Sequence, residues 1–478
     1  MVAGDGPKGV NARQRVAVVG CDSGPPPSVR VRAARLAKCR FVRKKMKRAI
    51  PSDTEAIAAS FVVSGLILGL GMITGVVLAR SLGPQARGEL AAILLWPSLL
   101  AALGSLGVAD AVLYHAARRS DPLGTIVGTS LLIALAQSLI LGIGALLVVP
   151  AVLSLRGIDA PITVYLSLLY IPLFLVTDYL IFVLAGIQRL SWFQALRLSW
   201  VVISAAMLTA LWLTGGLSVR SAVLVYLATF ALIIAVASVL VIPAGGLRLR
   251  YSHQLAKSLL SFGIKSHLST ASGVLNQRVD QLVISVFLAP TALGTYVVAV
   301  AISSVPAVVG SAIALVVFPR VARLQAGRAR DAMARRTVQL TLFTATVIAV
   351  VLMVTVHWLV GFLVGSAYRD AVNIARVLIV ASVFLGMSST LTALLKAVGR
   401  PLQAGLGASL ALLVTVAGLI LLVPPYGLMG AAVVSLAAYA VSATFMLQRA
   451  ARELELPIGA LLFPRDSGHL LVSEYAED

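Results

Sequence analysis

The sequence predicts an all-α polytopic membrane protein, with about twelve transmembrane helices in two parallel six-helix bundles around a central cavity. Three observations lead to this fold class. The chain of 478 residues is 59% hydrophobic and 12% charged, with a mean hydropathy of +0.98, whereas a soluble domain carries about 25% charged residues. Apolar spans of about 20 residues, long enough to cross a bilayer, recur after residue 56. The second half of the chain also repeats part of the first.

The spans are separated by short connections rich in Gly, Pro and charged residues. Their predicted ranges are 57–79, 90–114, 125–149, 161–186, 196–214, 219–242, 259–287, 292–316, 337–364, 372–397, 403–424 and 428–448. No connection is long enough to fold as a domain of its own. We therefore expect a tail over 1–50, one bundle over 51–245, a second bundle over 246–450, and a short cytoplasmic tail over 451–478.

The N-terminal tail is basic and polar. Residues 1–48 contain 13 Lys/Arg and two Asp and show no apolar periodicity, which is typical of a disordered segment and unlike a signal peptide. Either Met1 or Met46 fits as the natural start, because a basic segment and a capped helix follow Met46. Cys21 and Cys39 lack the spacing of a metal site or a disulfide framework, so neither is indicated, and no cofactor is expected.

The net charge of +21 is distributed as in a membrane protein. Fifteen Lys/Arg fall in connections on the side of the N-terminus, against five on the other side, Arg80 and Arg87 among them. The positive-inside rule then places both termini in the cytoplasm. Charges in short loops do not form a nucleic-acid-binding face, so a nucleic-acid partner is not expected.

An internal repeat appears at an offset of 206 residues. Residues 82–105 and 288–311 align without gaps at eight identical positions, which include Pro84/Pro290, Gly88/Gly294 and Gly104/Gly310. Six helices are an even number, so both halves enter the membrane in the same direction and form parallel repeats. Transporters built in this way place the substrate path between the halves and alternate access by rocking them.

Four motifs, in this order along the chain, resemble those of polysaccharide-unit flippases. They are LARSLGPQARGELAAI after the first span, RVDQLVIS in the seventh, LAPTALGTYVVAV at the start of the eighth and FPRVARLQAG at its end. These flippases are the O-antigen or exopolysaccharide translocases of the multidrug/oligosaccharidyl-lipid/polysaccharide exporter superfamily. The resemblance covers roughly residues 55–450 and implies movement of undecaprenyl-diphosphate-linked oligosaccharide from the inner to the outer leaflet of the bacterial cytoplasmic membrane.

The resemblance leaves two alternatives within the superfamily, a lipid II flippase and a small-molecule or drug exporter. Drug exporters often carry an acidic residue in the first span, and lipid II flippases usually add two C-terminal helices; this chain has neither feature. A membrane enzyme would need a large outer loop, and a silent scaffold would leave the polar seventh span unexplained. The implied partners are the lipid-linked oligosaccharide and membrane lipids, with a polysaccharide polymerase and glycosyltransferases as further candidates.

The seventh span is the candidate substrate site. At 100° per residue, Lys265, Asn276 and Asp280 share one face of a continuous helix, while Arg278 and Gln281 fill the adjacent sector. More than half of the circumference is polar, so this helix is expected to face protein or water. Arg278 and Asp280 are two residues apart and point in different directions, so each needs its own partner.

The chemistry of these side chains suits a lipid diphosphate. Arginine holds phosphate oxygens bidentately and lysine acts as a point charge, while amides bond sugar hydroxyls. The equivalent first-half segment, LGMIT at 70–74, is uncharged, so the fold itself does not require the charges. Arg376 is a further cavity candidate, with snorkelling to the interface as its alternative. Asp178 is expected to pair with a cavity cation or to bind a coupling proton. No ATP-binding or catalytic motif is present, so no enzyme is predicted.

Overall fold

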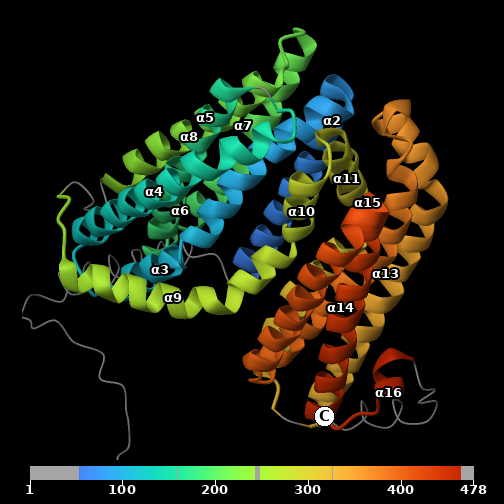
Figure 1. Cartoon of the computed structure of the whole chain (residues 1–478). Helices are drawn as coiled ribbons and strands as arrows, with labels where there is room; N and C mark the ends of the chain where they lie inside the picture. The colour runs from blue at the N-terminus through green and yellow to red at the C-terminus, as the bar shows by residue number, and fades with distance from the viewer. Residues whose placement is uncertain (1–52, 159, 243–247, 326, 464–478) are drawn as a thin grey trace, which may run out of the picture. The chain divides into compact units, whose positions relative to one another are not determined.

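The computed structural model describes residues 53–158, 160–242, 248–325 and 327–463, and these form helices without β-strands (Figure 1). The predicted disordered tail over 1–50 and the choice between Met1 and Met46 lie outside the described residues. The helices are α2 (Asp53–Gly104), α3 (Val108–Arg118), α4 (Leu123–Ser154), α5 (Pro161–Leu168), α6 (Tyr170–Gly186), α7 (Leu190–Leu213), α8 (Val219–Val241), α9 (His253–Asn276), α10 (Val279–Phe287), α11 (Pro290–Ser303), α12 (Val305–Arg323), α13 (Arg328–Leu363), the 3₁₀ turn η2 (Ser366–Tyr368), α14 (Ala371–Ala397), α15 (Pro401–Glu453) and α16 (Ile458–Leu462).

The apolar helices confirm a multi-pass membrane protein. Within the described ranges, eight helices are long and apolar enough to cross a membrane, or nine if the bent pair α11–α12 is one span. Two of the eight, α2 and α15, are interrupted at Gly83 (φ 71°) and Gly427 (φ 55°), a left-handed conformation that glycine adopts without strain. Each of the predicted spans falls, to within one residue, in a helix or in two helices joined by a short turn.

The connection predicted after the first span is largely helical. Gly83 bends α2, and Pro84 then begins a new helical segment, a position where proline is tolerated because no intrahelical donor is lost. The expectation that Arg80 and Arg87 lie in an outer loop is therefore wrong. Arg80 instead donates to the carbonyl oxygens of Leu363, at 2.7 Å, and Phe362, which ties α2 to the last turn of α13.

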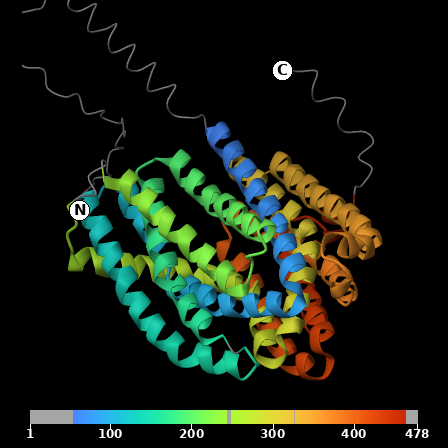
Figure 2. The same cartoon turned by 90° about the horizontal axis from the view of Figure 1, so that it is seen from above.

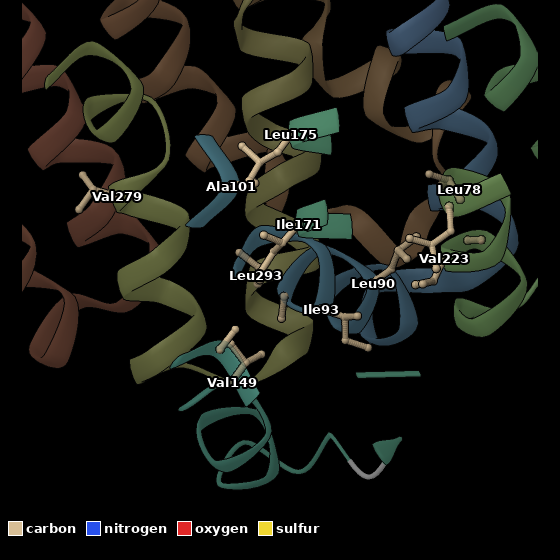
Figure 3. Close-up of a cluster of buried hydrophobic side chains, with 14 of the residues drawn as sticks. Leu78, Leu90, Ile93, Ala101, Val149, Ile171, Leu175, Val223, Val279 and Leu293 are labelled. Atoms are coloured by element: carbon tan, nitrogen blue, oxygen red, sulfur yellow. The ribbon is translucent and has the colours of Figure 1, made fainter. Parts of the chain in front are cut away.

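The main hydrophobic core draws on both halves of the chain. Figure 3 shows part of it, with Leu90 on α2, Ile171 on α6, Val223 on α8 and Leu293 on α11. Helix α9, from the second half, packs along α3 and α4 of the first (Figure 1). Viewed from above, the blue α2 lies between the green helices of the first half and the orange helices of the second (Figure 2).

A reciprocal contact joins the two halves at the start of the repeat. A Cβ atom added to Gly88 would meet the carbonyl of Pro290 and the amide of Gly294, and one added to Gly294 would meet the carbonyl of Pro84 and the amide of Gly88. These four residues are the repeat-related pairs Pro84/Pro290 and Gly88/Gly294. Each half therefore presents the same backbone surface to the other, as in a two-fold interface between subunits.

Candidate functional site

The seventh predicted span is broken in its middle. Helix α9 ends at Asn276 and α10 begins at Val279, so Gln277 and Arg278 form a turn, with Arg278 at φ −132° and ψ −14°. The prediction of one continuous polar face over this span is therefore wrong, because the break resets the helical register. Irregular backbone at membrane depth is tolerated where protein or water satisfies it. A break at this position is typical of substrate sites in transporters.

Asp280 lies in the first turn of α10 and is buried, with 6% of its surface exposed. One carboxylate oxygen accepts a hydrogen bond from the hydroxyl of Tyr296 on α11, at 2.8 Å, and the other accepts from the backbone amide of Gln281, at 2.7 Å. Because Tyr296 is itself fully buried, the pair forms a fixed polar contact inside the second half. A buried carboxylate depends on such partners.

Asn276 ends α9 on the other side of the break and is also buried. Its side-chain oxygen accepts a hydrogen bond of 3.0 Å from the hydroxyl of Thr415 on α15. Thr415 shares its proton with the carbonyl of Ala411 in its own helix, at 2.8 Å. Helices α9 and α10 both contact α15, so the break is supported by side chains on both sides.

Arg278 points the other way and is exposed. Its guanidinium donates to the side-chain oxygen of the buried Gln281, one turn further along, at 3.3 Å. In the part of the chain that the structure describes, Arg278 and Asp280 form no ion pair, as their spacing predicts. The two charges on either side of the start of α10 therefore differ in environment, with Arg278 exposed and Asp280 buried.

The structure brings Asn276, Asp280 and Gln281 together as buried groups with Arg278 beside them. Lys265 is exposed three turns earlier on α9. Arg376 is exposed on α14 and donates to the side-chain oxygen of Asn373, at 3.3 Å, in its own helix. Neither Lys265 nor Arg376 contacts the group at the break through a described hydrogen bond or ion pair, so their roles stay predictions.

Asp178 lines a separate cavity of about 220 Å³ within the first half, between α2, α6, α7 and α8. The wall also contains Arg197 and Trp200 of α7 and Thr177 of α6. The indole nitrogen of Trp200 and the hydroxyl of Thr177 are buried without a hydrogen-bond partner among the described residues, and Asp178 has no ion pair within 4.0 Å there. The cavity thus holds a carboxylate with free hydrogen-bonding groups around it.

Sequence reasoning singled out Asp178 but missed Arg197, Thr177 and Trp200. Arg197 lies within α7, about two turns from its start, and not in a connection. Arg197 and Trp200 are three residues apart and so share a face of that helix. That spacing is the signal that could have placed both on the wall facing α6.

Comparison with known proteins agrees with this architecture. A family model described as polysaccharide biosynthesis protein matches residues 77–373. None of the curated proteins matches the chain in sequence. Among solved structures, the chain is similar to the lipid II flippase MurJ in an inward closed conformation, with a TM-score of 0.67 and 15% identity over 84% of this chain and 88% of that one.

A second similar structure is a multidrug resistance MATE family transporter of the MOP superfamily in an inward-facing conformation. Its TM-score is 0.66, at 14% identity over 82% of this chain and 94% of that one. An outward-facing MATE transporter gives a TM-score of 0.57, at 15% identity over 86% of this chain and 96% of that one. At such identities these likenesses bear on the fold, and the family model covers well over half of the chain. The chain belongs to the polysaccharide biosynthesis protein family.

Proposed function

We propose that this protein flips undecaprenyl-diphosphate-linked oligosaccharide repeat units across the bacterial cytoplasmic membrane, by alternating access of its two halves, for surface polysaccharide synthesis. Membership of the polysaccharide biosynthesis family and the fold of a MOP transporter support this proposal. The observation that carries it is the break between α9 and α10. There an exposed arginine, Arg278, stands beside a buried polar group in the middle of a predicted membrane span.

The proposed role of the break follows from the substrate's chemistry. A flippase takes a charged, sugar-bearing headgroup through the bilayer while the polyprenyl chain stays in lipid. Arg278 binds phosphate oxygens, and Lys265, further along α9, provides a second charge on the path. Asn276 and Gln281 are placed to bond sugar hydroxyls once the halves move. Asp280, held by Tyr296, keeps the start of α10 in place.

Asp178 is proposed as the coupling group. Its carboxylate lies in a cavity with unpaired hydrogen-bonding groups, which suits exchange of a proton or a monovalent cation. The cavity belongs to the first half, and the break belongs to the second. Both termini are proposed to be cytoplasmic, as the distribution of positive charge predicts. A polysaccharide polymerase and glycosyltransferases are proposed partners, since they would consume and supply the lipid-linked unit.

The test is complementation of a strain whose own copy of this gene is deleted. We expect Arg278→Ala to abolish surface polysaccharide while the amount of protein in the membrane stays normal, and Arg278→Lys to restore part of it. Losing a charge-assisted hydrogen bond weakens substrate binding by about 1.5–3 kcal/mol, or roughly 10- to 150-fold. Arg220→Ala is the matched control, because Arg220 is an exposed arginine at the start of α8.

The same strain separates the alternatives. Loss of surface polymer in viable cells favours the repeat-unit flippase, whereas arrest of cell-wall synthesis favours a lipid II flippase. Increased sensitivity to small toxic cations with normal polymer favours a drug exporter. Normal polymer in Arg278→Ala and Asp280→Ala would contradict the role given to the break.

A further inference from the structure

A second cavity, of about 150 Å³, lies between α2, the α11–α12 pair and α13. It borders helices of both halves and is distinct from the break between α9 and α10. Its wall consists of one cation, Arg87, and otherwise of apolar residues and glycine: Met72, Gly75, Val76, Val297, Val298, Ala301, Ile302, Val305, Leu352, Leu359, Leu363 and Val364. The wall of the cavity is thus apolar except at Arg87.

Arg87 is the group that this cavity leaves unexplained. Its side chain is half-buried, and its Nε atom is fully buried without a hydrogen-bond partner. Within the described ranges Arg87 takes part in no ion pair. A buried donor without a partner is costly, and more so when it belongs to a cation. Such a residue persists where it meets a ligand that the protein alone does not provide.

The neighbours of Arg87 fix its position. The next residue, Gly88, lies against the carbonyl of Pro290 in the reciprocal contact between the halves. One turn before the break in α2, Arg80 binds the carbonyl oxygens at the end of α13, and Tyr368 donates to the carbonyl of Ala79, at 3.2 Å. These contacts hold the backbone of α2 in place on both sides of Arg87.

A cation at the edge of a hydrocarbon cavity selects one kind of ligand. A sugar needs several polar partners, which these walls lack, and an organic cation is repelled by Arg87. An anionic group joined directly to a hydrocarbon chain satisfies both parts of the wall at once. We propose that this cavity binds a lipid phosphate, with a phosphate oxygen on the guanidinium of Arg87 and the first carbons of the chain against α11 and α13.

This inference rests on the proposed function for the identity of the lipid, but not for the site. The phosphate belongs either to the transported polyprenyl diphosphate or to an anionic phospholipid of the membrane. A bound phosphate would touch residues of both halves directly beside the contact of Gly88 with Pro290. Its arrival would therefore act on the same surface that must open for the halves to separate.

The experiment measures lipid binding to the purified full-length protein in detergent by native mass spectrometry. The probes are undecaprenyl diphosphate, phosphatidylglycerol and, as a zwitterionic reference, phosphatidylcholine. Arg87→Gln removes the charge, Arg87→Lys keeps it, and Ala301→Trp fills the cavity. Arg369→Gln is the matched control, because Arg369 is exposed in the turn before α14. Size-exclusion profiles identify any variant that fails to fold.

We expect Arg87→Gln to weaken binding of the anionic probes by about 10- to 100-fold, as for loss of a charge-assisted hydrogen bond. Arg87→Lys should retain most of the affinity, and Ala301→Trp should lose it even though the arginine is present. A loss confined to undecaprenyl diphosphate identifies the transported lipid, and an equal loss for phosphatidylglycerol identifies a general lipid-phosphate site.

Unchanged affinity of both anionic probes for folded Arg87→Gln and Ala301→Trp would overturn the inference. It would leave the proposed function standing if polymer production still depends on Arg278. Conversely, a wild-type protein that binds phosphatidylglycerol through Arg87 but supports no polymer would refute the proposed function while keeping the site.

Discussion

At the reciprocal contact of Gly88 with Gly294, replacing either glycine by alanine should change how closely the two halves approach each other. A Cβ atom at Gly88 would lie 1.7 Å from the carbonyl oxygen of Pro290, and one at Gly294 would lie 2.0 Å from that of Pro84. An unstrained contact between such atoms is about 3.3 Å or longer. The two backbones must therefore separate by roughly 1.3–1.6 Å in Gly88→Ala or Gly294→Ala, because no side chain is present that could yield.

That displacement disfavours the closed contact rather than the fold of either half. Overpacking costs about 1–3 kcal/mol, which changes an equilibrium between two conformations by about 5- to 150-fold. The contact lies on the side of the membrane predicted to be outside. We therefore expect Gly88→Ala to raise the population in which the halves are apart on that side, and transport to slow because closure is impaired.

Distance measurement between spin labels tests this directly. Gln85 and Thr291 are both exposed, are related by the repeat offset of 206, and flank the contact. The natural cysteines, Cys21 and Cys39, lie in the N-terminal tail and can be replaced. Labels at Gln85→Cys and Thr291→Cys should give a short distance in the parent chain and an added longer population in the alanine variant.

Gly71→Ala is the control for helix propensity, because a Cβ atom there meets nothing within 4 Å. It should leave the distance distribution unchanged. If Gly88→Ala and Gly71→Ala give the same distribution as the parent, the contact does not restrain the halves. The reasoning from the missing Cβ atoms would then be refuted.

Three further outcomes follow from described contacts. Tyr296→Phe should lower the free energy of unfolding by about 1.5–3 kcal/mol, as seen in thermal denaturation in detergent, because the buried carboxylate of Asp280 loses a donor; an unchanged midpoint would contradict that role. Asp178→Asn should stop polymer production while the protein folds normally, and normal polymer would exclude coupling through this group. The hydrogen bond from Gln403 lowers the pKa of Glu453, so its contribution to stability is present at neutral pH and lost as pH falls through the lowered value. Glu453→Gln should accordingly reduce the thermal midpoint at pH 7, and the difference from the parent should close once the pH has fallen below the lowered pKa of Glu453.

The fold was accessible from sequence because hydropathy and connection length nearly determine it in a membrane. Lipid provides no partners for backbone groups, so apolar spans of this length form helices. The repeat was visible for a related reason, since Pro84/Pro290 and Gly88/Gly294 match at a fixed offset. The contact between these residues in the folded protein could not be predicted. A repeat identifies equivalent positions but does not show which of them lie near the pseudo-two-fold axis.

The break between α9 and α10 could not be predicted from the polar pattern. The turn consists of Gln277 and Arg278 and not of the proline or glycine that commonly interrupts a helix. A continuous helix accommodates the same side chains. The turn is instead supported by tertiary bonds, from Thr415 to Asn276 and from Tyr296 to Asp280. These partners lie 139 and 16 residues away along the chain. Helical periodicity contains no information about such contacts.

The two halves share their contact surface but not their charges, and this difference bears on mechanism. Residues that meet their own repeat partners must lie near the pseudo-two-fold axis, so Gly88 and Gly294 mark where that axis leaves the protein. The equivalent of Arg278 in the first half is Met72, which lines the cavity of Arg87. The equivalent of Arg87 in the second half is the buried Leu293.

Arg87 and Arg278, one from each half, thus both lack an ion-pair partner among the described residues, and they stand at positions that the repeat does not relate. A symmetric ligand would gain nothing from this arrangement, whereas a lipid diphosphate has a hydrocarbon end and a sugar end. The apolar cavity of Arg87 suits the hydrocarbon end, and the break beside Arg278, with its amide side chains, suits the sugar end. In the proposed flippase, the duplicated scaffold would provide the movement, and the unequal charges would set the orientation in which the lipid-linked substrate passes.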